Sequence, residues 1–318
     1  MQYNFCTPLD KNYLYRGLAL HASLIKHCPN FKLWILCMDD IVYETLDKMQ
    51  LDKVEIISLN EFENEDLLSI KPTRSAEEYC WTCKPSLLLY IINNKKDLDI
   101  ITYLDSDTFF FSPPEAIFND FGNKSIMITP HRFPPEKKDQ EQTKGIYNAG
   151  MLSFRNNQET LECLQWWNKR CIEWCYHYYE DGKLADQLYL NDWPERFRDV
   201  HILQHKGANL APWNVSQYKI QQKDGQIFVN DDPLIFYHFH SLKIYSKSQF
   251  ELSYESYNLL PKHKKIIYEP YLNELKNVIE QVKLIDNGFH YGFSIKPNIL
   301  KQMKKNVKNI LKQLKIYG

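Results

Sequence analysis

The sequence predicts an α/β protein with a mixed, mainly parallel central sheet, helices on both faces and a helical C-terminal appendage. Short apolar segments alternate with amphipathic helical segments through the first half of the chain. Such strand–helix–strand repetition implies parallel strands joined by crossover helices. The composition, 44% hydrophobic and 25% charged over 318 residues, is that of a globular chain with a large core. No internal repeat or Gly/Ser-rich linker divides it.

The elements of the first half follow from periodicity. Leu14, Leu18, Leu20, Leu24 and Ile25 recur near the helical period of 3.6 residues. The run FKLWILCM at 31–38 has the apolar continuity of a buried strand, and 100–104 forms another that ends on an acidic residue. Strands are therefore expected at 3–6, 31–38, 53–58 and 100–104, and helices at 12–27, 41–50 and 82–93.

The second half is more varied. The stretch 131–145 is polar, contains two Pro and one Gly, and predicts a mobile surface loop. Strands are expected at 147–154, 200–203, 226–229 and 234–239, and helices at 158–179, 183–190 and 262–284. We expect one catalytic domain over 1–245, a helical extension over 246–294 and a separate segment over 295–318.

The N-terminus lacks the basic and apolar segments of an export signal, and no apolar run approaches the about 20 residues of a spanning helix. A cytoplasmic protein is expected, with its eight Cys as thiols. Cys80 and Cys83, together with Cys171 and Cys175, have the spacing of a zinc site. The aromatic surroundings of the second pair favour packing instead.

Asp105 and Asp107 form the strongest candidate site. They follow the apolar strand 100–104, and ligands bind at the carboxyl ends of parallel strands. Two carboxylates one residue apart offer the oxygen ligands that Mn²⁺ or Mg²⁺ prefers. A diphosphate could share the same ion, which would neutralise charge on a departing diphosphate. The alternative is a solvated turn at a strand end.

A second candidate is Phe236-Tyr-His-Phe-His240, because His238 and His240 point to one face of a strand. Imidazole beside two carboxylates favours a borderline metal such as Mn²⁺. We expect His238 to be the third metal ligand, with His240 as the alternative.

These segments, taken in order, resemble the GT-A nucleotide-sugar transferases, and most closely glycosyltransferase family 8. The resemblance covers about residues 1–245. The late family motif continues from His into Gly and then Lys-Pro-Trp, whereas this chain has Ser-Leu-Lys243. The matching segments are Cys6-Thr7, Lys84, Leu104-Asp105-Ser106-Asp107, Tyr147-Asn148-Ala149-Gly150, Ala185-Asp186-Gln187 and His238-Phe-His240.

The resemblance implies a metal-dependent glycosyltransferase that uses a nucleotide-sugar, with UDP as the expected nucleotide. Asp105, Asp107 and His238 would hold the metal. The residues expected to contact donor or acceptor are Thr7, Lys84, Ser106, Asn148, Ala149, Trp213, Asn214, His240 and Lys243. Trp213 and Asn214 combine a flat ring with an amide, as a sugar-binding surface does.

Asp186 and Gln187 are the expected catalytic residues. In a retaining reaction, either would stabilise an oxocarbenium-like state while the leaving phosphate takes the acceptor proton. An inverting reaction would instead recruit a carboxylate such as Asp186 as base. The alternative for Asp186 is a helix-terminal charge.

The C-terminal segment 295–318 contains seven Lys and no Asp, Glu or Arg. Removing these charges from the formal net charge of −1 leaves −8 for the other residues. Apolar residues between 299 and 314 form one helical stripe among the lysines. This pattern predicts an amphipathic helix on an anionic membrane surface, at the inner face of the cell membrane. A lipid-linked glycan or other glycan acceptor would suit that location.

Nucleic acid is not an expected partner, because the rest of the chain is acidic and carries no recognition motif. Two other functions remain open. A sugar-1-phosphate nucleotidyltransferase would bind nucleotide and metal on a related fold, but the stretch after the first strand is neither Gly-rich nor basic. A catalytically inactive glycan-binding relative is the other.

Overall fold

The computed structural model describes residues 2–254, 256–257 and 259–296. The helices are α1 (Leu14–His27), α2 (Asp40–Met49), α3 (Leu59–Phe62), α4 (Glu65–Ile70), η1 (Lys71–Thr73), α5 (Ala76–Asn94), α6 (Glu115–Phe121), η2 (Pro135–Gln140), α7 (Glu141–Lys144), α8 (Gln158–Glu173), η3 (Leu188–Asp192), α9 (Trp193–Arg196), η4 (Val215–Gln217), α10 (Pro261–His263), η5 (Lys264–Tyr268) and α11 (Glu269–Ile285).

The strands are β1 (Tyr3–Leu9), β2 (Phe31–Cys37), β3 (Val54–Ser58), β4 (Ile100–Leu104), β5 (Thr108–Phe110), β6 (Ile126–Pro130), β7 (Tyr147–Arg155), β8 (Val200–Ile202), β9 (Ile220–Lys223), β10 (Gln226–Val229), β11 (Asp232–Pro233), β12 (Phe236–His238), β13 (Lys243–Ser246) and β14 (Gln249–Glu251).

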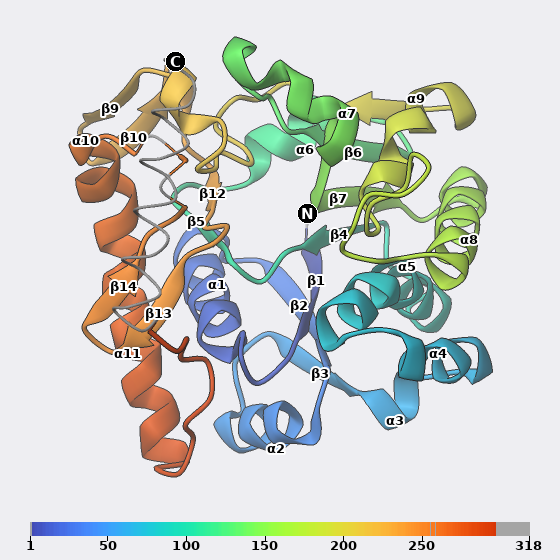
Figure 1. The fold of residues 1–318 in the computed structure, drawn as a ribbon, viewed down its shortest axis with the longest axis horizontal. Coiled ribbons are helices and arrows are strands. Elements are labelled where there is room, and N and C mark those ends of the chain that lie inside the picture. Colours follow the sequence, from blue (N-terminus) through green and yellow to red (C-terminus); the bar gives the residue numbers. More distant parts are fainter. Residues whose placement is uncertain (1, 255, 258, 297–318) are drawn as a thin grey trace, which may run out of the picture.

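The central sheet has seven strands in the order β3-β2-β1-β4-β7-β6-β8 (Figure 1). β3, β2, β1 and β4 are parallel neighbours, whereas β7 runs antiparallel to both β4 and β6. β6 and β8 are again parallel. The expected mixed, mainly parallel sheet is confirmed, and the carboxyl ends of β1, β2, β3 and β4 lie along one edge.

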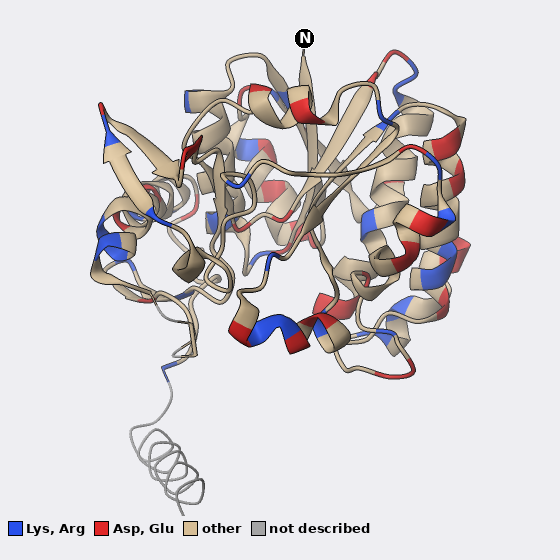
Figure 2. Ribbon diagram, turned by 90° about the horizontal axis from the view of Figure 1, so that it is seen from above, with Lys and Arg blue, Asp and Glu red and all other residues tan. Residues whose placement is uncertain are grey.

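Alternation along the strands divides the apolar residues between two cores. Phe5 of β1 packs with α1, α2 and α11 on one face, whereas the adjacent Cys6 packs with α5 and α8 on the other. Turned by 90°, the strands lie between these helices, and charged residues of both signs are spread over the outside (Figure 2). Helices on both faces are thus confirmed.

Several expected boundaries are wrong. β1 continues to Leu9, because Thr7, Pro8 and Leu9 pair with β2. α8 ends at Glu173, and 174–187 is mostly irregular, so the long helix to 179 and the helix from 183 do not form. The stretch 131–145 contains two short helical segments, η2 and α7, and is not irregular throughout.

The C-terminal helix expected at 262–284 is present as α10, η5 and α11. Leu275, Val278 and Val282 of α11 are fully buried or nearly so, in the same core as Leu14 and Leu18 of α1. The extension after residue 245 therefore shares a core with the sheet. None of the described helices has the length and apolarity needed to cross a bilayer. The predicted basic amphipathic helix at 295–318 lies outside the described residues from 297 onward.

The cysteines are packing residues in the described part of the chain. Cys83, Cys171 and Cys175 are buried in the core between the sheet, α5 and α8, and Cys80 is partly exposed. Within residues 2–296, apart from 255 and 258, these thiols do not form a group of three or more potential metal ligands. The structure gives no support to a zinc site.

Candidate functional site

The turn between β4 and β5 presents the two acidic residues at the carboxyl edge of the sheet. The Asp105 N–H donates to the Gly150 carbonyl on β7 (2.8 Å), which fixes the start of the turn. The Asp105 carbonyl accepts from the N–H (3.2 Å) and the hydroxyl (2.8 Å) of Thr108. This closed turn places the Asp105 and Asp107 side chains on the same side.

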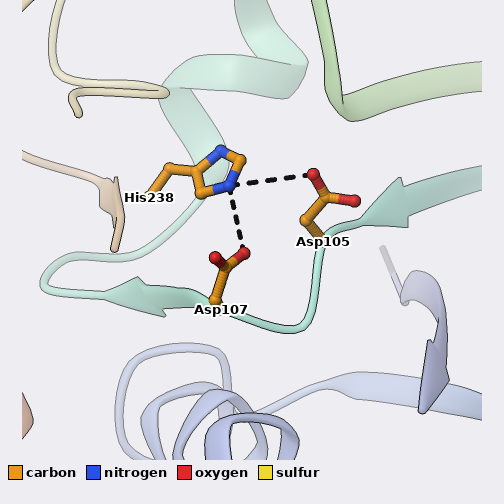
Figure 3. A group of neighbouring side chains, drawn as sticks. All are labelled: Asp105, Asp107 and His238. Carbon is orange, nitrogen blue, oxygen red and sulfur yellow. Dashed lines mark ion pairs between the residues drawn. The ribbon is translucent and has the colours of Figure 1, made fainter. Parts of the chain in front are cut away.

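β12 brings the imidazole to these carboxylates. It pairs antiparallel with β5, with His238 opposite Thr108, and the Phe239 N–H donates to the Asp107 carbonyl (2.8 Å). His238 Nε2 consequently lies 3.0 Å from Asp107 Oδ1 and 3.7 Å from Asp105 Oδ2 (Figure 3). Gly150 permits this approach, since a Cβ there would come within 2.8 Å of the imidazole.

Asp105, Asp107 and His238 each offer a ligand atom, and the three atoms lie within 4.8 Å of one another. Within the described residues no other such group of three occurs. Two carboxylate oxygens and one imidazole nitrogen suit a divalent cation such as Mn²⁺ or Mg²⁺, and three protein ligands leave positions for a substrate. The donor set therefore fits the metal that the sequence predicts.

The charges of these side chains shift the pKa values of Asp107 and His238. Burial alone would raise the pKa of Asp107, but His238 beside it holds that pKa well below its usual range. Burial opposes a charge on His238, yet Asp107 and Asp105 together raise its pKa. A cation would replace the imidazole proton as the partner of both carboxylates.

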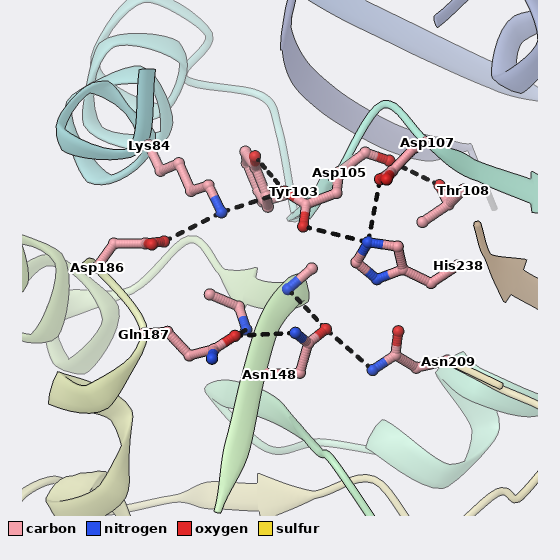
Figure 4. Close-up of polar contacts among 12 residues, drawn as sticks. Lys84, Tyr103, Asp105, Asp107, Thr108, Asn148, Asp186, Gln187, Asn209 and His238 are labelled. Atoms are coloured by element: carbon pink, nitrogen blue, oxygen red, sulfur yellow. Dashed lines mark hydrogen bonds and ion pairs between the residues drawn. The ribbon is translucent and has the colours of Figure 1, made fainter. Parts of the chain in front are cut away.

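Lys84 of α5 connects this group to the second acidic position. Its Nζ lies 3.1 Å from Asp105 Oδ1 and 3.1 Å from Asp186 Oδ2 (Figure 4). The Lys84 side chain is only 5% exposed, and burial would lower its pKa; the two carboxylates outweigh burial and raise it. Burial raises the pKa of Asp186, while Lys84 opposes that shift. Tyr103, two residues before Asp105, donates its hydroxyl to the same Oδ1 (2.8 Å).

An amide network forms the opposite side of the site (Figure 4). Gln187 Oε1 accepts from Asn148 Nδ2 (2.9 Å) and from the Ala149 N–H (3.0 Å). Asn148 Oδ1 accepts in turn from the Gly150 N–H (3.1 Å) and Asn209 Nδ2 (3.1 Å). Both carbonyl oxygens thus have two donors, which fixes the orientation of Asn148 and Gln187.

Trp213 and Asn214 lie behind the metal group. Trp213 is 5% exposed and places its ring 5.2 Å from the His238 ring and 5.6 Å from the His240 ring. Asn214 is fully buried, with its amide bonded to the backbone of Ala211, His131 and Asn209. The polar atoms of Asn214 therefore hold the loop, and its expected contact with a sugar stays a prediction.

The remaining expected contacts fall in different places. Thr7 is fully buried inside β1, which continues to Leu9, so the strand does not end at this residue, and the expected contact of Thr7 with the nucleotide stays a prediction. Ser106 occupies the turn between Asp105 and Asp107 and is buried. His240 packs against Trp213 and Tyr254 and is not in the metal group. Lys243, on β13, pairs with Glu251 (2.5 Å).

Lys243 also lines a cavity of about 330 Å³. The cavity begins where β1 leads into α1, which is the carboxyl edge of the sheet, and it includes Asn12, Tyr13 and Arg16. The sequence did not single out these three residues. They could have been identified only from their position just after the first strand, which requires knowing that this strand ends at Leu9.

Other supporting residues were also missed. Tyr103 could have been found from strand alternation, since residues two apart in β4 and its continuation share a face with Asp105. Asn209 and His131 carry no such signal. Their roles depend on loops that meet only in the folded chain: Asn209 bonds to Asn148, and the His131 carbonyl accepts from Trp213 Nε1 (3.0 Å).

A mixed sheet of this order, with paired aspartates and a histidine at its edge, is the arrangement expected of a GT-A glycosyltransferase. The structure is similar to that of galactosyltransferase LgtC in complex with donor and acceptor sugar analogs, with a TM-score of 0.58 at 15% identity over 86% of this chain and 95% of that one. It is also similar to glycosyltransferase GlyE of Streptococcus pneumoniae TIGR4, with a TM-score of 0.52 at 15% identity over 93% of this chain and 66% of that one.

The family model for glycosyl transferase family 8 matches residues 5–316. Two Bacillus subtilis (strain 168) proteins are similar along most of their length. YfnD is 33% identical over 294 residues, covering 92% of this chain and 94% of its own. YfnF is 34% identical over 300 residues, covering 92% and 97%. The chain belongs to glycosyltransferase family 8.

Proposed function

We propose that this chain transfers a sugar from a UDP-sugar to a glycan or lipid-linked glycan, with retention of anomeric configuration. The observation that carries the proposal is the group Asp105, Asp107 and His238 at the sheet edge. Lys84 links this group to Asp186 through salt bridges to Asp105 and Asp186. Family membership favours this function over the sugar-1-phosphate nucleotidyltransferase that the sequence left open.

The metal, Mn²⁺ or Mg²⁺, would be held by Asp105, Asp107 and His238 and would supply positive charge to the leaving diphosphate. Lys84 keeps Asp105 and Asp186 at fixed separation, since one ammonium is shared between them at 3.1 Å. The Lys84 ammonium also lowers the pKa of Asp186, against the larger effect of burial, which raises it. Ser106, between the two ligands, is proposed to contact the diphosphate.

The donor sugar would lie between Asp186 and the amide network. The carbonyl oxygens of Asn148 and Gln187 each accept two hydrogen bonds. The Asn148 NH₂ group donates to Gln187, and the Gln187 NH₂ group donates to the Lys144 carbonyl. Each NH₂ group therefore has one N–H left for a sugar hydroxyl. Ala149 contributes to the amide network only through its backbone N–H, which donates to Gln187.

The proposed retention is supported by the chemistry of two side chains. The Gln187 oxygen has two donors already and is a weak nucleophile, so a covalent intermediate on it is disfavoured. Asp186, held by Lys84, would stabilise an oxocarbenium-like state, and the leaving phosphate would accept the acceptor proton. Trp213 and His240 border the metal group from the other side and are proposed to face the acceptor.

The acceptor is proposed to be part of a surface polysaccharide or lipopolysaccharide made at the inner face of the cell membrane. The support for this is the composition of 295–318, with seven Lys and an apolar stripe. Binding to vesicles of phosphatidylglycerol and phosphatidylcholine tests it. Full-length protein should sediment with anionic vesicles, and a chain ending at Lys296 should not; equal binding by the two would reject membrane attachment.

The test of the activity is a screen of nucleotide-sugars for metal-dependent thermal stabilisation and hydrolysis. A ligand at 100 times its Kd stabilises the folded state by about 2.7 kcal/mol. We expect a UDP-sugar to raise Tm only with Mn²⁺ or Mg²⁺ present, and Asp105→Ala to abolish that increase. Stabilisation without any hydrolysis or transfer would instead identify an inactive, ligand-binding relative.

A further inference from the structure

The segment 289–294, which we call the C-terminal strap, crosses the start of α1 after α11 has ended. Figure 1 shows it in red, turning back from the end of α11 towards β13. Phe289 and Phe293 both contact Tyr15, with ring centroids 5.7 Å and 5.5 Å from its ring. The Ser294 N–H donates to the Ile244 carbonyl (2.7 Å), which ties the strap to β13.

Gly292 shows how closely the strap fits. Its φ is +82°, a conformation that L side chains rarely adopt. A Cβ at this position would lie 2.8 Å from the Tyr15 ring. The strap is therefore held against α1 by a backbone conformation and a close approach that glycine alone allows.

The strap forms one wall of the cavity described above. Gly292, Phe293 and Ser294 line it together with Asn12, Tyr13 and Arg16 at the start of α1. Ser241, Leu242, Lys243 and Tyr254 complete the lining. At about 330 Å³, the cavity is at the lower end of the range of about 300–1,000 Å³ typical of small-molecule sites.

The lining has the chemistry of a site for an aromatic, anionic ligand. Arg16 is 7% exposed and donates to the Asn12 (3.1 Å) and Leu242 (2.8 Å) carbonyls, so its charge is fixed at the wall. Lys243 supplies a second cation. Tyr13 and Tyr254 expose 43% and 48% of their surface, and phenol rings stack on bases.

Short backbone links join the lining of the cavity to the metal group. The Leu242 N–H donates to the Phe239 carbonyl (3.2 Å), and the Phe239 N–H donates to the Asp107 carbonyl (2.8 Å). A ligand in the cavity could thus reach a cation at Asp107 with its phosphates.

We infer that the C-terminal strap is part of the donor site and forms a wall against the nucleoside diphosphate portion of the nucleotide-sugar. This inference rests on the proposed function and deepens it. Binding of the diphosphate would draw Lys243 from Glu251, because a phosphate carries more charge than one carboxylate. Donor affinity would then depend on residues 289–294, whereas the metal ligands lie far earlier in the chain.

The experiment compares strap variants in the full chain by titration calorimetry with UDP at saturating Mn²⁺. Gly292→Val forces Tyr15 away, and Phe293→Ala removes a ring from the wall. We expect each to weaken UDP binding by about tenfold or more. Ile295→Ala is the matched control, since Ile295 is 94% exposed, does not line the cavity and should leave the affinity within about twofold.

Two truncations separate the strap from the lysine-rich end. A chain ending at Lys296 keeps the strap and should bind UDP like the full chain, whereas one ending at Asp286 should not bind. Circular dichroism and Tm report folding, and Phe293→Ala decides the outcome if the shorter chain does not fold. Unchanged UDP affinity in Gly292→Val and Phe293→Ala would overturn the role of the strap and leave the proposed function intact. Absence of Mn²⁺-dependent UDP binding in the full chain would overturn the proposed function with it.

Discussion

Replacing Lys84 with methionine should destabilise the protein strongly at neutral pH. Methionine keeps most of the apolar length of the side chain but removes the ammonium shared by Asp105 and Asp186. Asp186 is 3% exposed, so its carboxylate would be left buried without a counter-charge. Removing one partner of a buried ion pair costs about 3–5 kcal/mol. Asp105 contributes less to this cost, because its side chain is 25% exposed and also accepts from Tyr103.

The pH dependence of this loss has a definite sign. Burial already raises the native pKa of Asp186 above its unfolded value, and Lys84 is the group that opposes the shift. Without Lys84 the native pKa rises further. Between the unfolded value, about 3.9, and that raised value, the native state binds more protons than the unfolded state. The free energy of unfolding of Lys84→Met therefore increases as pH falls through this window.

Urea denaturation of wild type, Lys84→Met and Lys84→Met/Asp186→Asn at pH 5, 6, 7 and 8 measures the effect. The double variant should recover much of the lost stability, since a neutral amide needs no counter-charge, and it should lose the extra pH dependence. A cost of less than about 1 kcal/mol for Lys84→Met at pH 7, with no recovery in the double variant, would refute the buried bridge as the source of stability.

Three further substitutions or conditions test the site. Gly150→Ala should displace the His238 imidazole, because the new Cβ would lie 2.8 Å from that ring. We expect Mn²⁺ affinity to fall by about 10–100-fold. An unchanged affinity would contradict the close packing of Gly150 on His238. Gln187→Leu leaves the Asn148 amide and the Ala149 N–H without their acceptor. The free energy of unfolding should fall by about 1–3 kcal/mol, and turnover should fall as well. Wild-type turnover would exclude the amide network from the reaction. Mn²⁺ affinity, measured by calorimetry, should decrease as pH is lowered through the raised pKa of His238, because a proton and the ion compete for the imidazole; a pH-independent affinity would remove His238 from the ligand set.

The sequence predicts the parts of this protein that depend on local pattern. The sequence places strand 100–104 and Asp105 correctly, because the apolar run ends directly at acidic residues. His238 could be identified as the metal histidine candidate because it follows an apolar strand, but only the β5–β12 register separates it from His240. Element boundaries in the aromatic stretch 174–190 failed, since Trp and Tyr fit helix, strand or loop equally well.

Contacts made between distant loops could not be predicted. Asn214 looked like a sugar ligand from its neighbours, yet its amide satisfies the backbone of the loop that packs beneath His131. Lys84 is expected near the donor, but nothing in the sequence indicates that it joins Asp105 to Asp186. Asp186 lies 102 positions after Lys84 in the chain. The strap lies on α1 through Gly292 and Tyr15, a pairing that depends on a glycine conformation visible only in the fold.

The central claim is that two aspartates and one histidine hold a cation that in turn holds a nucleoside diphosphate. The direct measurement is an anomalous difference map from a crystal soaked with MnCl₂ and UDP. The account predicts one Mn²⁺ peak bonded to Asp105, Asp107 and His238 Nε2, with diphosphate oxygens completing its coordination. An ion bound elsewhere, or a diphosphate bound away from that ion, would contradict it.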